Sequence, residues 1–125
     1  MEMFARADLY SFQNKFTAAD KVLDSINQIY PGHTLGDDIY FLKGKMVLKQ
    51  RDTEKAIDYF SKVFSLYPDD LLADDAIFIL ANIYENKDKE KAMEYYQKII
   101  IDYPGSTYVI EARDKFRKLR GDNLN

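Results

Sequence analysis

The residues best suited to chemistry in this sequence are two pairs of adjacent aspartates and a single histidine. Asp37-Asp38 and Asp74-Asp75 have the carboxylates needed for metal binding or proton transfer, and His33 is the one imidazole. Neighbouring residues on a helix point about 100° apart, so neither pair converges on one ligand alone. Acids are also favoured in the first turn of a helix, where they complement its dipole. We therefore expect both pairs to mark helix starts, and His33, with no evident partner, to be a surface turn residue.

Other reactive groups are missing from the sequence. The 125 residues include no cysteine, which excludes disulfides, thiolate metal ligands and cysteine nucleophiles. No phosphate-binding loop, nucleophile elbow or zinc-ligand spacing occurs. The net charge of −3 gives no broad attraction to nucleic acid. We expect no enzyme activity, no cofactor, no metal and no nucleic-acid partner.

The composition is that of a globular domain. Apolar residues make up 46% of the chain and charged residues 31%. The longest strongly apolar stretch runs from Ala76 to Ile83 and is interrupted by Asn82. A membrane-spanning helix needs about 20 apolar residues. We therefore expect a soluble protein with no transmembrane segment.

An internal repeat organises the sequence. Tyr-Pro pairs recur 37 and 36 residues apart, and each is preceded by an alanine with apolar residues four and seven positions after it. These residues are Tyr30-Pro31, Tyr67-Pro68 and Tyr103-Pro104, then Ala19, Ala56 and Ala92, then Leu23, Phe60 and Tyr96, then Ile26, Val63 and Ile99. The spacing 0, 4, 7 defines one face of a helix, and a fixed period of this length is typical of stacked repeats.

A second helix is predicted between each proline and the next alanine. Ile39, Leu42 and Met46 form one apolar stripe, and short polar turns follow at Lys49–Asp52 and Asn86–Asp88. Proline ends each unit because the residue before it is pushed out of the helical region. The predicted helices cover residues 2–13, 17–30, 36–49, 53–67, 72–86, 89–103 and 107–120.

Helix termini have their own signals. Thr34 with Asp37, and Thr17 with Asp20, resemble capping boxes in which aspartate replaces glutamate. Gly121 follows the last predicted helix, where a glycine commonly provides the C-terminal cap.

These residues resemble the tetratricopeptide repeat pattern of an aromatic, leucine, a small residue and tyrosine, followed by alanine, an aromatic and proline. The three units read Met3, Arg6, Ala7, Tyr10, Ala19, Leu23, Pro31; then Tyr40, Lys43, Gly44, Val47, Ala56, Phe60, Pro68; then Ile77, Leu80, Ala81, Tyr84, Ala92, Tyr96, Pro104. Tryptophan is missing, and Arg6 and Lys43 replace leucine. The resemblance implies an all-α, right-handed α-solenoid of antiparallel helical hairpins. It would form one domain over residues 1–125, with repeats at about 1–31, 32–68 and 69–104 and a capping helix at about 107–120.

The resemblance also implies a function and a surface. Family members bind proteins or peptides in a concave groove lined by the first helix of each hairpin. The corresponding positions here are Phe4, Asp8, Phe41, Lys45, Phe78 and Asn82. The three phenylalanines are 37 residues apart, so they would form an aromatic ladder for an extended or helical peptide. We expect a protein-interaction scaffold.

Two other interpretations of this surface remain open. Apolar residues at helical spacing are usually core, so the phenylalanine rings would then pack between adjacent first helices. Some family members instead clamp a partner's C-terminal carboxylate, and Lys45 and Asn82 occupy suitable positions. Phe41 and Phe78, however, stand where such a clamp needs polar groups.

The last predicted helix carries a basic cluster, which we call the basic patch: Arg113, Lys115, Arg117, Lys118 and Arg120. One hypothesis is that it meets an acidic partner, a phosphate or lipid headgroups. The alternative is a solvated face favoured by the helix dipole.

The first hairpin has no cap of its own, and Met1, Met3 and Phe4 stand where a preceding hairpin would pack. This pattern predicts either the C-terminal piece of a longer array or a homodimer through the first hairpin. Self-association of repeat ends is thus the alternative function. The Tyr-Pro ends and the aspartate-rich helix starts resemble bacterial envelope members of the family. The resemblance therefore implies a location in the bacterial periplasm or envelope, or in the cytoplasm.

Overall fold

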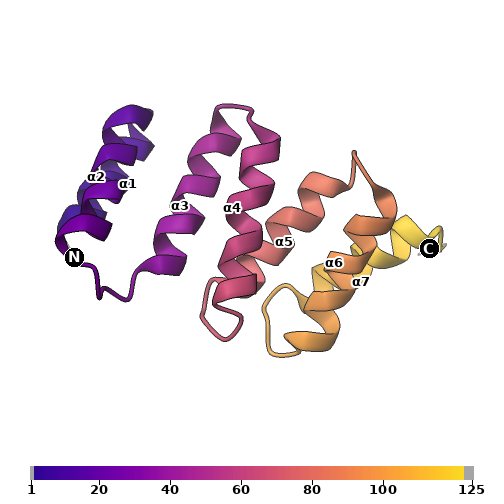
Figure 1. Ribbon diagram of the computed structural model, residues 1–125. Helices are drawn as coiled ribbons and strands as arrows, with labels where there is room; N and C mark the ends of the chain where they lie inside the picture. Colours follow the sequence, from indigo (N-terminus) through magenta and orange to yellow (C-terminus); the bar gives the residue numbers. More distant parts are fainter. Residues whose placement is uncertain (1, 123–125) are drawn as a thin grey trace. The chain divides into compact units, whose positions relative to one another are not determined.

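The computed structural model describes residues 2–122, and every regular element in that range is an α-helix. The helices are α1 (Glu2–Phe12), α2 (Phe16–Ile29), α3 (Gly36–Lys49), α4 (Thr53–Leu66), α5 (Ala73–Tyr84), α6 (Lys89–Asp102) and α7 (Val109–Arg120) (Figure 1). Each boundary differs from its predicted position by at most two residues. The all-α, helical-repeat class predicted from the sequence is confirmed.

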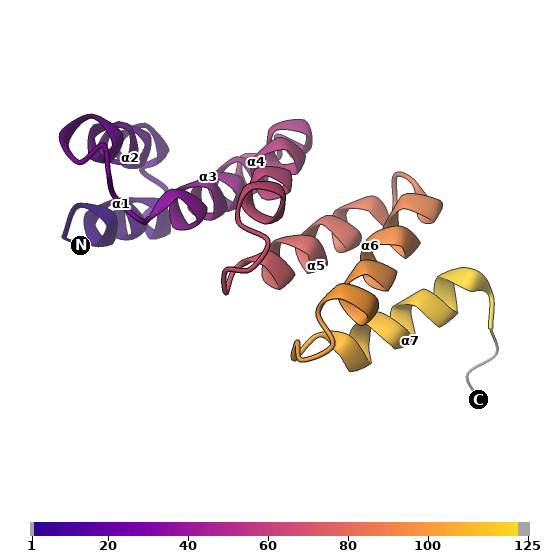
Figure 2. The same cartoon turned by 60° about the horizontal axis from the view of Figure 1, so that its bottom comes forward.

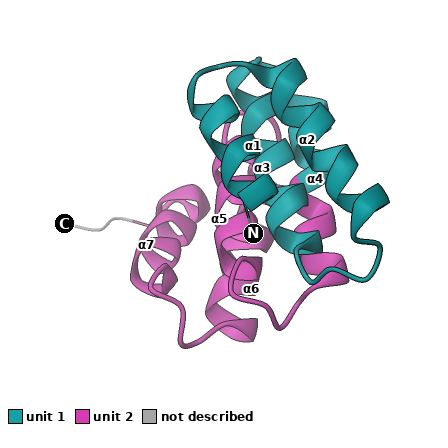
Figure 3. Cartoon of the chain, turned by 90° about the vertical axis from the view of Figure 1, so that its left-hand side faces the viewer, with its two compact units in different colours: residues 1–59 teal, residues 60–125 magenta. Residues whose placement is uncertain are grey.

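The chain divides into two compact units, residues 1–59 and 60–125 (Figure 3). The boundary falls inside α4, between Tyr59 and Phe60. Unit 1 therefore holds α1, α2, α3 and the first half of α4. Unit 2 holds the second half of α4 and helices α5, α6 and α7.

Unit 1 is organised around the antiparallel hairpin of α1 and α2, against which α3 packs. Its core consists of small and aliphatic side chains from these three helices, and the buried ones are Ala7, Ala19, Leu23, Ile26, Ile39, Leu42 and Met46. Lys43, which stands in place of the family's leucine, lies beside this core with its ammonium 2.8 Å from Asp24 Oδ1. This ion pair explains how a lysine is accommodated at a largely covered position.

Unit 2 packs α6 between α5 and α7, as the view in Figure 2 shows. Its core is richer in aromatic residues than that of unit 1. The buried members are Ile77, Phe78, Ala81, Ala92, Tyr96, Ile99 and Ala112. Tyr96 is fully buried and brings a hydroxyl into this core, so it requires a polar partner there.

Two aspartates cap helices in the turns between hairpin arms. Asp88 Oδ1 accepts a hydrogen bond from the Lys91 amide, and Asp52 Oδ1 accepts one from the Lys55 amide. An aspartate at this position satisfies one of the amides that a helix start leaves without a partner. Because the two residues are 36 apart, they are part of the repeat.

The predicted capping boxes are wrong. Helix α2 begins at Phe16 after Lys15, and α3 begins at Gly36 after Leu35, with no side-chain cap at either start. Phe16 and Leu35 both pack against the core of unit 1 and lie at the helix starts. Neither Thr17 nor Thr34 therefore occupies the capping position. The predicted C-terminal cap is confirmed, since Gly121 adopts a left-handed conformation with φ of 97°.

Candidate binding surfaces

The three phenylalanines of the predicted ladder lie on the first helices of the hairpins, one each on α1, α3 and α5. Phe4 and Phe41 are half-buried, whereas Phe78 is only 8% exposed. Helices α1 and α3 of unit 1 pack against each other, and Phe4 packs against the core of that unit. Phe4 and Phe41 therefore both keep part of their surface exposed.

Phe78 is packed more completely than the other two rings. Its ring stacks on Tyr108 with a centroid separation of 4.3 Å and meets Tyr96 edge-on at 5.8 Å. Offset stacking and edge-to-face contacts are the preferred arrangements of aromatic pairs. In unit 2 the ladder position therefore contributes to the core, as the packing interpretation requires.

The polar members of the predicted surface are all exposed. Asp8 lies one turn beyond Phe4 on α1, and Lys45 lies one turn beyond Phe41 on α3. The Lys45 ammonium sits 5.3 Å from the centroid of the Phe41 ring. A cation over a ring face is attracted by the ring quadrupole, so the two residues form one amphipathic contact surface.

Asn82, on α5, belongs to a polar network that the sequence did not predict. The Tyr96 hydroxyl lies 2.5 Å from Asn82 Oδ1 and 2.7 Å from Glu85 Oε1. The Lys115 ammonium lies 3.2 Å from the same Glu85 oxygen, so the network joins α5, α6 and α7. Burial, followed by the hydrogen bond to Glu85, raises the pKa of the Tyr96 phenol well above its usual value. One sequence signal was present, because a tyrosine at a core position of the repeat needs a polar partner.

The basic patch on α7 is divided between paired and solvent-facing residues. Lys115 is paired with Glu85, and Arg120 forms an ion pair with Asp122. The pair with Asp122 raises the pKa of Arg120 and lowers that of Asp122. The exposed members Arg113, Arg117 and Lys118 complete the predicted patch.

The aspartate pairs lie in the first turns of α3 and α5, as predicted. The pair in α5, Asp74 and Asp75, also binds the loop that precedes α7. Asp74 Oδ2 accepts a hydrogen bond from the Ser106 hydroxyl at 2.6 Å, and Asp75 Oδ1 accepts one from the Tyr108 hydroxyl at 2.5 Å. Within residues 2–122, no group of three or more acidic, histidine or cysteine side chains is arranged to hold a metal ion.

A shallow hollow of about 370 Å³ lies beside these contacts in unit 2. Its lining includes Pro68, Asp70, Asp74, Tyr103 and Ser106. The Tyr103 hydroxyl donates a hydrogen bond to the Pro68 carbonyl oxygen at 2.8 Å. The hollow is thus bordered by the residues that connect successive hairpins.

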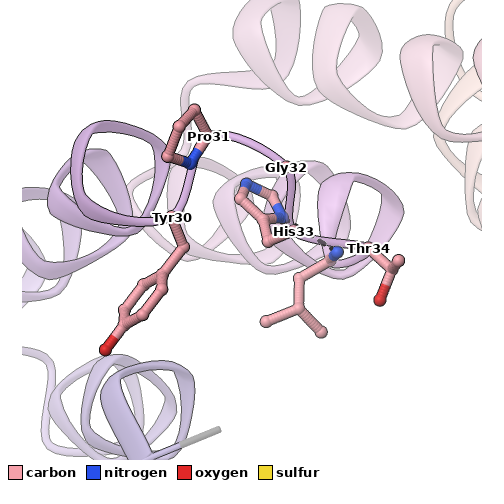
Figure 4. Close-up of a pocket in the computed structure, with 6 residues that line it drawn as sticks. Tyr30, Pro31, Gly32, His33 and Thr34 are labelled. Carbon is pink, nitrogen blue, oxygen red and sulfur yellow. Dashed lines mark hydrogen bonds between the residues drawn. The ribbon is translucent and has the colours of Figure 1, made fainter.

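His33 lies in the loop between α2 and α3 and has two hydrogen-bond partners, contrary to the prediction. Its Nδ1 accepts from the Leu35 amide at 2.9 Å, so Nε2 carries the ring proton and donates to Asn27 Oδ1 at 2.6 Å. The loop borders a hollow of about 580 Å³. Figure 4 shows the six residues that line this hollow, and the Tyr30 ring is directed away from His33. His33 is a turn residue, as expected, and it organises the start of α3.

The first hairpin exposes apolar side chains. Phe12 is 81% exposed and Leu9 is 53% exposed, and they lie on one side of α1 at a spacing of three residues. Single exposed apolar residues are common, but neighbouring ones mark candidate interaction surfaces. None of the helices in the described part of the chain is both long and apolar enough to cross a membrane.

Comparison with known proteins bears on the repeat directly. Two family models, each described as tetratricopeptide repeat, match residues 37–70 and 75–106, which together make up more than half of the chain. A search of the curated proteins finds no match. The matched segments each span one predicted repeat, from the start of a first helix to the turn that follows the second helix. The chain therefore belongs to the tetratricopeptide repeat family.

Proposed function

We propose that this chain is a scaffold that holds a peptide or protein segment on the first-helix faces of its hairpins. Tetratricopeptide repeats generally mediate protein–protein interactions, and the two matched repeats support the same class of function here. Members of the family are typically non-enzymatic scaffolds, so the proposal is a binding protein and not an enzyme.

One observation carries the proposal. On the packed pair α1 and α3, two half-buried rings lie beside two exposed charges of opposite sign: Phe4 with Asp8, and Phe41 with Lys45. Aromatic anchors bordered by polar groups are the usual composition of a binding surface. A peptide with an apolar side chain and a neighbouring charge fits this face of unit 1. In unit 2, Asn82 is the exposed member of the same set.

A peptide-display selection tests the proposal and does not require the natural partner to be identified. Random dodecapeptides selected on the wild-type protein are re-measured on the double variant Phe41→Ala/Lys45→Glu. The matched control is Ile29→Ala/Lys21→Glu, which makes equivalent changes at two exposed positions of α2. We expect binding to fall at least about tenfold for the first variant and less than about twofold for the control.

Thermal unfolding of the three proteins shows whether the comparison is valid. Both variants need to melt within a few degrees of the wild type for the binding loss to be assigned to the surface. Equal affinity of the selected peptides for all three proteins would refute the proposed face.

The second candidate function is assembly through the first hairpin, and the exposure of Leu9 and Phe12 favours it. A second copy of the chain would cover these side chains in a homodimer. Light scattering over a range of concentrations tests this candidate, with the double variant Leu9→Glu/Phe12→Glu as the expected monomer. A wild-type protein that stays monomeric at high concentration would exclude it.

A further inference from the structure

The outer face of α7 carries two guanidinium groups beside an exposed isoleucine. Arg113 and Arg117 are four residues apart and Ile110 is three residues before Arg113, so the three side chains lie along one stripe of the helix. All three are exposed, and Ile110 is 73% exposed. Neither arginine forms an ion pair or a side-chain hydrogen bond within residues 2–122. We call these three residues the α7 stripe.

The opposite side of α7 packs into unit 2. Ala112 is fully buried, and Phe116 packs against the same core, so this side of the helix already has its contacts. Asp114 is the exposed acid next to the stripe, and it points about 100° away from Arg113 around the helix. The α7 stripe therefore keeps both its positive charge and an uncovered apolar side chain.

The loop before α5 carries the opposite combination. Leu71 is 93% exposed and directly follows two exposed aspartates, Asp69 and Asp70. In the described part of the chain, neither carboxylate has an ion-pair partner. We call these three residues the loop triplet, and they line the hollow of about 370 Å³ in unit 2. An apolar side chain bordered by charged groups is the usual composition of an interaction surface.

The loop triplet and the α7 stripe belong to neighbouring segments of unit 2. The Tyr103 hydroxyl donates to the Pro68 carbonyl oxygen, and the Ser106 hydroxyl donates to Asp74. These bonds hold the loop before α7 against the loop before α5 and the start of that helix. Figure 1 shows the two loops at the same end of the unit, with α7 leading away from them. Unit 2 thus presents an acidic and a basic half-site, each with its own exposed apolar side chain.

We propose that two copies of the chain pair through unit 2, with the loop triplet of each copy docked on the α7 stripe of the other. Leu71 of one copy would contact Ile110 of the second copy, and the two carboxylates would meet the two guanidinium groups. Arginine and carboxylate form strong, charge-assisted hydrogen bonds. A twofold axis repeats every contact, so a surface that carries both halves of a complementary pair closes a dimer. This contact involves neither the proposed peptide-binding face nor the first hairpin.

A second copy fits this surface better than a polyanion such as a nucleic acid or an acidic membrane. The chain has a net charge of −3, and Asp69 and Asp70 add negative charge in the same unit as the stripe. A polyanion is repelled by this charge. A second copy instead covers the acids and the arginines together, and it also removes both exposed apolar side chains from water.

Charge reversal in two halves tests the pairing. Asp69→Lys/Asp70→Lys makes both half-sites positive, and Arg113→Glu/Arg117→Glu makes both negative, so each variant should repel its own copies. Sedimentation equilibrium should give each variant a dissociation constant at least about tenfold above that of the wild type. An equimolar mixture of the two variants should associate to within about threefold of the wild type, because opposite charges then face each other in both contacts.

Two control variants separate this pairing from other effects. Lys89→Glu/Lys91→Glu makes the same change in net charge at two exposed positions of α6 and should associate like the wild type. Leu9→Glu/Phe12→Glu should also keep the association, because it alters only the first hairpin. Circular dichroism and thermal unfolding establish that every variant is folded.

Three outcomes would overturn the inference. One is a wild-type protein that stays monomeric at a concentration on the order of 1 mM. Another is a mixture of folded charge-reversed variants that stays monomeric. The third is a monomeric wild type that binds hexaglutamate through Arg113 and Arg117, which would assign the stripe to an acidic partner instead. Peptide binding by the wild type is measured separately, so the scaffold function can stand or fall without this contact.

Discussion

Phe78 and Tyr108 stack face to face, with ring centroids 4.3 Å apart and planes inclined by 14°. Phe78 belongs to α5 and Tyr108 directly precedes α7, and the Tyr108 hydroxyl also donates to Asp75 on α5. The residue that directly precedes α7 thus covers the Phe78 ring on α5. Positions that are equivalent in the repeat, such as Phe41 and Phe78, therefore differ in role according to the side chains that pack on them.

Alanine substitution should separate packing from binding along the ladder. Phe78→Ala removes a ring that is 8% exposed and contacts Tyr96 and Tyr108, so we expect a loss of about 3 kcal/mol in the free energy of unfolding. Phe41→Ala removes a half-buried ring, and its expected loss is below about 2 kcal/mol. Urea unfolding of both variants measures the difference. Equal losses would mean that Phe41 is also a core residue.

Alkaline pH should weaken unit 2 through Tyr108. The hydrogen bond to Asp75, followed by burial, raises the pKa of Tyr108 to about 12. Because this folded-state pKa lies above the unfolded value of about 10, the stabilisation is fully present below about pH 10 and is lost as the pH rises through about 12. Between about pH 9 and about pH 11.5, urea unfolding should show a larger loss for the wild type than for Tyr108→Phe. Parallel losses would show that the Asp75 bond does not control this titration.

Glycine at position 51 should stabilise the turn between α3 and α4. Arg51 adopts a left-handed conformation with φ of 64°, which side chains with a Cβ atom adopt at a cost. We expect Arg51→Gly to raise the free energy of unfolding by about 0.5–1 kcal/mol. Arg51→Ala keeps the Cβ atom and serves as the control, with an expected change below about 0.5 kcal/mol. Thermal melts that rank alanine above glycine would contradict the backbone argument.

The loop before α3 should depend on the acceptor atom of His33. His33→Ala leaves the Leu35 amide without its side-chain acceptor, at an expected cost of about 1 kcal/mol. His33→Asn keeps an acceptor that can reach the amide two residues ahead, as asparagine does in Asx turns, so most of the stability should remain. Chemical denaturation compares the two variants. If asparagine is as destabilising as alanine, the bond from Nε2 to Asn27 is the more important contact.

The helices could be predicted from the sequence because their signals are local. The Tyr-Pro pairs and the apolar residues at spacing 0, 4, 7 depend only on neighbours along the chain. The same locality explains the capping errors at Thr17 and Thr34, where core packing of Phe16 and Leu35 set the helix start. The true caps, Asp52 and Asp88, also recur in the repeat, so their 36-residue spacing was a usable signal.

The polar network around Tyr96 could not be predicted in the same way. Its contacts join residues that are 11, 14 and 30 apart and lie on three different helices. A single sequence shows that a tyrosine occupies a core position, and therefore that its hydroxyl needs a partner. It does not show which of the nearby polar residues of α5 and α7 reach that hydroxyl, because this depends on how the helices pack.

The hydrogen bond from Tyr103 to the Pro68 carbonyl closes a loop of 35 residues, and those from Ser106 and Tyr108 to the α5 aspartates close loops of 32 and 33. Each such contact costs the chain the loop-closure entropy of about one repeat, and that cost grows only with the logarithm of loop length. Shorter loops favour faster folding, because less loop-closure entropy is lost before stabilising contacts form. We therefore expect the hydrogen bonds between neighbouring hairpins of unit 2 to form without the entropy cost of closing any loop longer than about one repeat.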